Sequence, residues 1–302
     1  MNFQEFKSRY QKAPVEEYPN KVTDVPVVSV CVMTYQHKDY IRQCLDSILM
    51  QKTDFPFEVL LGEDASTDGT REICIEYAER YPDKIRLFLH ERANNIHING
   101  SPTGRFNFLY NLFSAKGEYI ALCEGDDYWV DIHKLQKQYD FLESNLEYVL
   151  VKSKQRNVDE IGNTLSVSNG GTRTIMFRNI VKLPVDFINI IPHGDNLLNG
   201  VLKLYGKTFS LNEVTAAWRK HPEGLWGPLT DQGNEAKLQL NRGLSKVGTG
   251  LTLLKMKNIK YGEAYILNAI PNLLRATETP YTWKDKLRLL AKMFKIIFNK
   301  NI

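Results

Sequence analysis

Short apolar runs alternate with amphipathic helical segments in the first half of this chain, and this alternation limits the possible folds most. Four runs have strand character: Val27 to Met33, Phe57 to Leu61, Lys84 to His90 and Tyr119 to Cys123. A connection between parallel strands must cross over the sheet, and in most proteins a helix makes that crossover. The pattern therefore predicts an α/β protein with a Rossmann-like, mostly parallel sheet.

The pattern changes after a predicted helix at residues 134–143. Four further runs predict a smaller mixed sheet: residues 148–151, 157–161, 165–167 and 172–177. Leu and Tyr stripes at helical spacing predict a helical region at residues 229–280. Residues 1–24 read as a lead-in with one short polar helix.

Composition and charge exclude several classes of protein. The chain has 302 residues, 43% of them hydrophobic, and no run approaches the roughly 18 apolar residues that span a bilayer. Its net charge is +4, but residues 283–302 contribute +5, which leaves the rest near −1. A body with that charge argues against nucleic-acid binding. The N-terminus lacks the features of a signal peptide, and the four cysteines lack metal-ligand spacing, so we expect buried thiols and a cytoplasmic protein.

The segment Glu118 to Trp129 is the strongest candidate for a functional site. An apolar run ends abruptly in Glu124, Gly125, Asp126 and Asp127. Carboxylates packed this closely repel one another unless a cation lies among them, and Mg²⁺ or Mn²⁺ prefers carboxylate oxygens. Tyr128 and Trp129 follow with rings suited to stacking on a sugar or base. From these residues alone, a solvated acidic turn beside a core Trp explains the pattern equally well.

Polar residues also follow the first two predicted strands, at Thr34 to His37 and Gly62 to Thr70. Ligands of parallel sheets bind beyond the carboxyl ends of the strands, so we expect these segments to meet. The Gly-rich fingerprints of dinucleotide-binding proteins and P-loop proteins are missing from the sequence.

These motifs resemble family 2 glycosyltransferases of the GT-A fold, in particular the bacterial enzymes that build surface polysaccharides. The match rests on V-S-V-C-V-M-T-Y at 28–35, G-E-D-A-S-T-D-G-T at 62–70 and C-E-G-D-D-Y-W at 123–129. H-G-D-N at 193–196 and W-R-K-H-P-E-G-L-W at 218–226 match more weakly. The resemblance covers roughly residues 26–227 and implies a catalytic domain at 25–227. Residues 25–130 would bind the nucleotide-sugar, 131–227 would bind the acceptor, and 228–302 would form a helical C-terminal region.

The resemblance also implies a role for each matching residue. A nucleotide-sugar, with UDP expected as its nucleotide, would be bound by nine residues: Thr34, Tyr35, Glu63, Asp64, Asn95, Arg105, Asn107, Arg219 and His221. Glu124, Asp126 and Asp127 would hold Mn²⁺ or Mg²⁺, although Glu stands where the family's D-x-D element begins with Asp. Tyr128, Trp129 and Trp226 would contact the acceptor, a glycan or lipid-linked sugar.

By the same resemblance, Asp195, which follows Gly194, matches the family's general-base position, and a carboxylate opposite the metal can take the proton of the attacking hydroxyl. A helix N-cap is the alternative role for Asp195, and a surface Arg and a solvated His are the alternatives for Arg219 and His221. The basic, apolar-rich tail at 283–302 suits an anionic membrane surface, or else docks on the enzyme body or in a homo-oligomer. Two other functions stay open, a sugar nucleotidyltransferase and a non-catalytic scaffold subunit.

Overall fold

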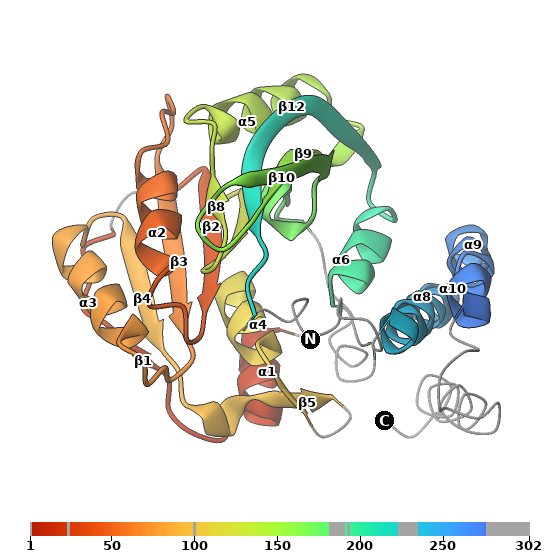
Figure 1. The fold of residues 1–302 in the computed structure, drawn as a ribbon, viewed down its shortest axis with the longest axis horizontal. Coiled ribbons are helices and arrows are strands. Elements are labelled where there is room, and N and C mark those ends of the chain that lie inside the picture. The colour runs from red at the N-terminus through yellow and green to blue at the C-terminus, as the bar shows by residue number, and fades with distance from the viewer. Residues whose placement is uncertain are drawn as a thin grey trace. The chain divides into compact units, whose positions relative to one another are not determined.

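The apolar runs of the sequence form the parallel centre of the sheet, as predicted. Four strands pair in parallel in the order β4, β3, β2, β7: Ile85–Leu89, Phe57–Glu63, Val28–Thr34 and Tyr119–Glu124. Thr34 lies opposite Glu63, and Met33 lies opposite Glu124. The carboxyl ends of β2, β3 and β7 therefore meet at one edge of the sheet. Figure 1 shows β2, β3 and β4 of this sheet with α2 and α3.

The computed structural model describes residues 2–22, 25–98, 101–180, 191, 194–222 and 235–275. The chain divides into two units. The first comprises Met1–Ile96, Pro102–Val181 and Gly206–Lys220. The second comprises His97–Ser101, Lys182–Tyr205 and His221–Ile302. The boundary predicted between residues 130 and 131 lies inside the first unit.

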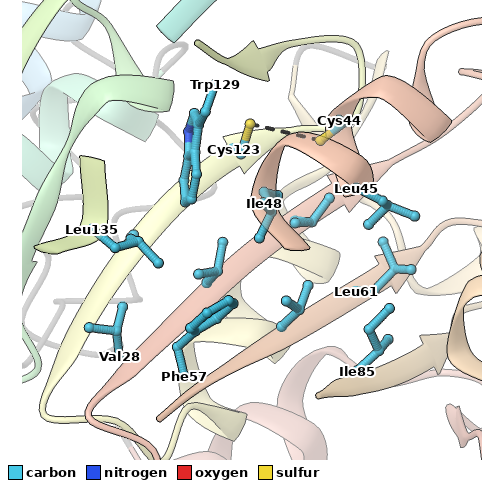
Figure 2. Packing of buried hydrophobic residues seen from close by; sticks show 14 of the residues in the cluster. Val28, Cys44, Leu45, Ile48, Phe57, Leu61, Ile85, Cys123, Trp129 and Leu135 are labelled. Carbon is cyan, nitrogen blue, oxygen red and sulfur yellow. Dashed lines mark hydrogen bonds between the residues drawn. The ribbon is translucent and has the colours of Figure 1, made fainter. Parts of the chain in front are cut away.

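Four helices connect the strands of the first unit: α2 (Ile41–Leu49), α3 (Thr70–Arg80), α4 (Arg105–Ser114) and α5 (Lys134–Ser144). Their apolar stripes pack on the sheet because each repeats at helical spacing. Figure 2 shows Leu45 and Ile48 of α2 in this core, with Phe57 and Leu61. Helix α2 begins after Tyr40 and α3 begins after Gly69, and neither N-cap residue makes a side-chain cap hydrogen bond.

The mixed strands are continuous with the parallel ones in a single ten-stranded sheet. They are β8 (Tyr128–Trp129), β9 (Tyr148–Val158), β10 (Thr164–Asn169), β11 (Met176–Arg178) and β12 (Lys207–Arg219). β11 joins the two parts by pairing antiparallel with both β7 and β9. The separate strand predicted at 157–161 was wrong, because β9 runs on to Val158, and a 3-10 turn, η2 (Thr172–Thr174), begins the last run.

The N-terminal segment predicted as a lead-in belongs to the first unit. Helix α1 (Phe3–Tyr10) stacks Phe6 against Phe106 of α4, with ring centroids 5.2 Å apart. Strand β1 (Glu16–Glu17) then pairs with β4 at the edge of the sheet. The segment between β4 and α4 contains η1 (Arg92–Asn94) and the short strands β5 (Ile96–Ile98) and β6 (Ser101–Thr103).

The described part of the second unit is helical, as predicted for the C-terminal region. It contains α6 (Gly194–Leu202), α8 (Glu235–Lys255), α9 (Ile259–Leu267) and α10 (Ile270–Arg275). Helix α8 packs against α6, α9 and α10. None of the helices in the described residues is both long and apolar enough to cross a membrane. The tail predicted to meet a membrane, 283–302, lies outside these residues.

Candidate active site

The loops after β2 and β7 close against each other, as the predicted meeting of strand ends requires. The amide of Gly125 donates to the carbonyl of Met33 at 2.9 Å. A Cβ atom at position 125 would lie 2.6 Å from Oγ1 of Thr34 and 2.9 Å from Nδ1 of His37. Only glycine fits there without a shift of its neighbours, so this contact sets the position of the acidic loop.

Asp126 lies at this contact, beside the histidine. Its Oδ2 is 3.9 Å from Nε2 of His37, and 21% of its side chain is exposed. The guanidinium of Arg219 donates from Nε to the backbone carbonyl of Asp126 at 3.1 Å, which fixes the backbone of the loop. Asp126 is therefore a carboxylate held at the strand edge with access to solvent.

Asp127, the next residue, lies in a different environment. Its side chain is 2% exposed, and its Oδ2 forms an ion pair with Nε of Arg173 at 2.6 Å. Its Oδ1 accepts the backbone amide of Arg219 at 2.9 Å. Burial raises the pKa of Asp127 well above its usual value, and the Arg173 cation opposes that rise. Both oxygens are already engaged by the protein.

Glu124 completes the acidic group. Its Oε2 lies 3.8 Å from Nε of Arg173, and 29% of its side chain is exposed. Burial raises the pKa of Glu124, Arg173 lowers it, and the neighbouring Asp126 raises it again. In the described residues, no three His, Cys, Asp or Glu side chains form a metal cage. Mg²⁺ in a phosphate-transfer site commonly uses one or two carboxylates plus substrate phosphates, so Asp126 and Glu124 fit a shared site of that kind.

The carboxylates that follow β3 are engaged by arginines. Glu63 is fully buried, and its oxygens accept from the Ser66 amide at 2.7 Å and from Nε of Arg71. These bonds shape the loop after β3, and the contact of Glu63 with the nucleotide stays a prediction. Asp64 accepts from Nη1 of Arg92 at 2.6 Å and from the amide of Asn95 at 3.1 Å.

Tyr35 lies next to the group formed by Asp64, Arg92 and Asn95, on its solvent side. The guanidinium of Arg92 lies 3.8 Å from the centre of the Tyr35 ring, and the tyrosine is 38% exposed. A chain of contacts therefore joins Tyr35, Arg92, Asp64 and Asn95 at the ends of β2 and β3. Thr34, also predicted to bind the donor, is buried beside it and contacts Nδ1 of His37 at 3.2 Å.

Three other predicted site residues have structural contacts instead. Asn107 is buried against β3 and donates to the carbonyl of Gly62 at 2.7 Å, and its contact with the donor stays a prediction. Arg219 is buried, and its guanidinium donates to the Asp126 carbonyl, the Glu160 carbonyl and Gln43, which leaves the predicted diphosphate role unsupported. Arg105 is buried at the first position of α4.

Trp129 is largely a core residue, and its contact with the acceptor stays a prediction. It is 3% exposed, its indole donates to the carbonyl of Arg173 at 2.9 Å, and Lys134 lies 4.1 Å above its ring. Figure 2 shows it among the core side chains with Cys123 and Leu135. Tyr128, by contrast, is half-buried and lines a hollow of about 580 Å³ beside α2.

The remaining predicted residues belong to the second unit or lie outside the description. Asp195 is exposed in the first turn of α6, where its Oδ1 accepts the amide of Asn196 at 2.8 Å. Burial, followed by the charge of Asp195, raises the pKa of Tyr265 to about 12. His221 is buried. Trp226 lies outside the described residues, so its role and that of His221 stay predictions.

The protein is an α/β protein whose mostly parallel sheet has an acidic edge, and comparisons with known proteins identify its family. A model described as Glycosyl transferase family 2 matches residues 29–194, more than half of the chain. The chain belongs to this family, and the resemblance stated from the sequence is confirmed.

Two relatives and two solved structures illustrate the likeness. An uncharacterized protein of Mycobacterium tuberculosis (strain ATCC 25618 / H37Rv) is 32% identical over 66% of this chain and 60% of its own length. The poly(ribitol-phosphate) beta-glucosyltransferase of Bacillus spizizenii is 31% identical over 39% of this chain and 17% of its own. The chain thus spans less than two thirds of each relative.

The structures show the shared fold. S. aureus TarS 1-349, solved in complex with UDP-GlcNAc, has a TM-score of 0.60 at 18% identity and covers 89% of this chain and 81% of its own. The mannosyltransferase PcManGT of Pyrobaculum calidifontis, solved with GDP-Man and Mn²⁺, has a TM-score of 0.56 at 17% identity. The match covers 97% of this chain and 93% of PcManGT. They support the predicted GT-A fold class.

Proposed function

We propose that this chain is an inverting glycosyltransferase that moves a sugar from a UDP-sugar to a hydroxyl of a glycan or lipid-linked acceptor. The observation that carries the proposal is the closure of the acidic loop onto the end of β2 at Gly125, which holds Asp126 at the strand edge. The nucleotide-sugars bound by TarS and PcManGT support this class of donor. The beta-glucosyltransferase relative, which acts on poly(ribitol-phosphate), supports a role in surface polysaccharide synthesis.

The donor would lie along the edge formed by β2, β3 and β7. The Tyr35 ring and the polar group of Asp64, Arg92 and Asn95 offer a stacking face and hydrogen bonds to a base and ribose. Asp126 and Glu124 would hold Mn²⁺ or Mg²⁺ next to the diphosphate, and a bound cation would stabilise the negative charge of the departing nucleotide. The half-buried Tyr128 in its hollow suits the acceptor sugar.

In the proposed transfer, the acceptor oxygen bonds to the anomeric carbon as the bond from that carbon to the phosphate oxygen breaks. The electron pair of the broken bond stays on the diphosphate. Asp195 accepts the proton of the acceptor hydroxyl, and attack opposite the leaving group inverts the anomeric centre.

UDP binding should require a divalent metal and an intact acidic loop. Calorimetry of UDP with Mn²⁺ and with EDTA tests this for the native chain and for the double variant Asp126→Asn/Asp127→Asn. We expect binding only in Mn²⁺ and none in the double variant, because the carboxylate at the strand edge is the metal's protein ligand. Equal UDP affinity in EDTA would contradict the proposal.

The same preparation tests Asp195 as the base. Asp195→Asn should leave UDP-sugar affinity nearly unchanged and lower turnover by roughly 10²–10⁴, the usual contribution of a general base. Asp140→Asn, a change to a surface carboxylate on α5, is the matched control. Normal turnover of Asp195→Asn would remove this residue from the mechanism, and loss of folding would instead favour a capping role.

We further propose that residues 283–302 bind the chain to the inner face of the plasma membrane, where a lipid-linked acceptor is available. Their net charge of +5 supports this, since each cation near an anionic surface contributes about 1 kcal/mol. Removal of residues 281–302 should abolish sedimentation with anionic vesicles and keep UDP binding. Equal sedimentation of both chains would make the tail structural.

A nucleotidyltransferase and a non-catalytic scaffold remain the alternatives. The first needs a Gly-rich loop with cations directly after the first strand, and Thr34 to His37 stand there instead. The second is less favoured because the acidic loop keeps its carboxylates in a built arrangement. Release of free sugar from a UDP-sugar, measured with Mn²⁺, separates catalysis from a scaffold.

A further inference from the structure

Arg173 is a cation built into the acidic site that the sequence did not reveal. It comes from η2, between β10 and β11, and is 9% exposed. Its Nε lies 2.6 Å from Oδ2 of Asp127 and 3.8 Å from Oε2 of Glu124. One buried guanidinium therefore faces two of the three carboxylates of the acidic loop.

The position of Arg173 is fixed at both ends. Its backbone carbonyl accepts the indole N–H of Trp129 at 2.9 Å, and its Nη1 donates to Oε1 of Gln155 at 3.2 Å. Gln155 also accepts the backbone amide of Gly171 at 2.9 Å, so the partner of the guanidinium is itself held in place. The guanidinium lies 5.5 Å from the ring of Trp218. Pairing with Asp127 is thus a permanent feature of the fold.

Because of this pairing, the carboxylates of the loop differ in how accessible they are to a ligand. Asp127 uses Oδ2 for Arg173 and Oδ1 for the amide of Arg219, and it is almost completely buried. Asp126 is ten times more exposed, at 21% against 2%. Glu124, at 29% exposed, is the other accessible carboxylate of the loop. One or two carboxylates alone are a poor site for Mg²⁺, and phosphate oxygens are the usual additional ligands.

We propose that Arg173 is a positioning residue that keeps Asp127 out of the metal shell, so that the loop binds a divalent cation only together with the donor diphosphate. The inference deepens the proposed function and rests on it. Because binding free energies are reciprocal, Mn²⁺ and UDP then raise each other's affinity by the same factor. Removal of the guanidinium leaves uncompensated carboxylates that attract the cation without UDP.

The experiment measures Mn²⁺ affinity by calorimetry, with and without UDP, and the melting temperature without metal. The variants are Asp126→Asn, Asp127→Asn, Arg173→Met, Arg173→Lys and the double variant Arg173→Met/Asp127→Asn. Arg178→Met is the matched control, because this arginine of the neighbouring strand β11 contacts Tyr119 and the Leu142 carbonyl rather than the acidic loop.

We expect Asp126→Asn to abolish Mn²⁺-dependent UDP binding, and Asp127→Asn to keep it within about 5-fold, the lower end of typical coupling. In Arg173→Met, Mn²⁺ affinity without UDP should rise about tenfold, and the coupling between Mn²⁺ and UDP should fall by the same factor. Arg173→Lys should behave like the native chain. The single variants Asp127→Asn and Arg173→Met should melt on the order of 10 °C lower, and the double variant should recover part of this loss.

Two outcomes would overturn the inference. One is a folded Asp127→Asn variant that loses UDP binding as completely as Asp126→Asn, since Asp127 is then a metal ligand. The other is unchanged coupling in Arg173→Met. If that variant does not fold, the double variant carries the test. Failure of the native chain to bind UDP with Mn²⁺ would sink the proposed function, and the melting temperatures would still report the pairing of Arg173 with Asp127.

Discussion

Two strand ends of one sheet carry adjacent acidic residues, and the surroundings of the carboxylates differ. After β3, Glu63 and Asp64 are both buried, and each is paired with an arginine from nearby in the sequence, Arg71 and Arg92. After β7, Asp127 is paired with Arg173, whereas Asp126 stays at the solvent edge. The comparison teaches that a count of carboxylates at a strand end does not identify a metal site. The number of carboxylates that stay accessible differs between the two strand ends, because the protein's own arginines pair with some of them.

The comparison predicts its largest effect for Arg71→Met, which should lose stability. Glu63 has no exposed side-chain surface, so removal of its partner leaves a buried charge uncompensated and should cost about 3 kcal/mol of unfolding free energy. Arg42→Met is the matched control, because Arg42 and Glu76 form a half-exposed pair worth about 0–1 kcal/mol. Urea unfolding measures both variants. A loss of less than 1 kcal/mol for Arg71→Met would show that Glu63 does not depend on this cation.

A smaller effect is expected in the pH dependence of stability at Asp64. Burial raises the pKa of Asp64 above its ordinary 3.8, against the effect of Arg92 and Asn95. The folded state then binds the proton more tightly than the unfolded state, so stability falls as pH rises from 3.8 through the folded-state pKa. Asp64→Asn removes this pH dependence, so its free energy of unfolding should rise relative to that of the native chain as pH rises over that range. Urea unfolding at stepped pH measures both.

Asp68, in the same loop, provides a control of opposite sign. Burial opposes the shift, but hydrogen bonds from Thr70 and Lys38 lower the pKa of Asp68 below 3.8. The ionised Asp68 therefore stabilises the folded state fully above pH 3.8, and this stabilisation is lost as pH falls through the folded-state pKa. Asp68→Asn should accordingly have a lower free energy of unfolding than the native chain above pH 3.8. A native chain that gains stability relative to Asp64→Asn as pH rises would contradict the assignment of Asp64.

The elements of the parallel sheet could be predicted from the sequence because each is encoded locally. The run from Val28 to Thr34 and the helical spacing of Ile41, Leu45 and Ile48 need no distant partner to be recognised. The meeting of strand ends follows from the parallel topology, so the position of the acidic loop was predicted as well. The short strands after residue 144 were less predictable, because pairing across the sheet decides where such strands begin and end.

The contacts at the candidate site that the sequence does not show share one physical origin. The sequence does not show which carboxylate is paired, and Arg173 stands 46 positions after Asp127 in a run that has strand character. Asn107 and Trp129 have the residue types of a sugar site, but tertiary packing buries both. A local signal existed for Arg71 and Arg92, since buried acids at a strand end require cations and both arginines follow within 30 residues of Glu63.

The close approach of Gly125 to Thr34 and His37 bears on how this protein can change over generations. The loop has no room for a methyl group there, so an Ala or Ser codon at position 125 would displace the acidic segment from the sheet edge. Tyr128, only three positions on and facing a hollow, has room for many side chains. Substitutions can therefore accumulate more readily around Tyr128 than at position 125.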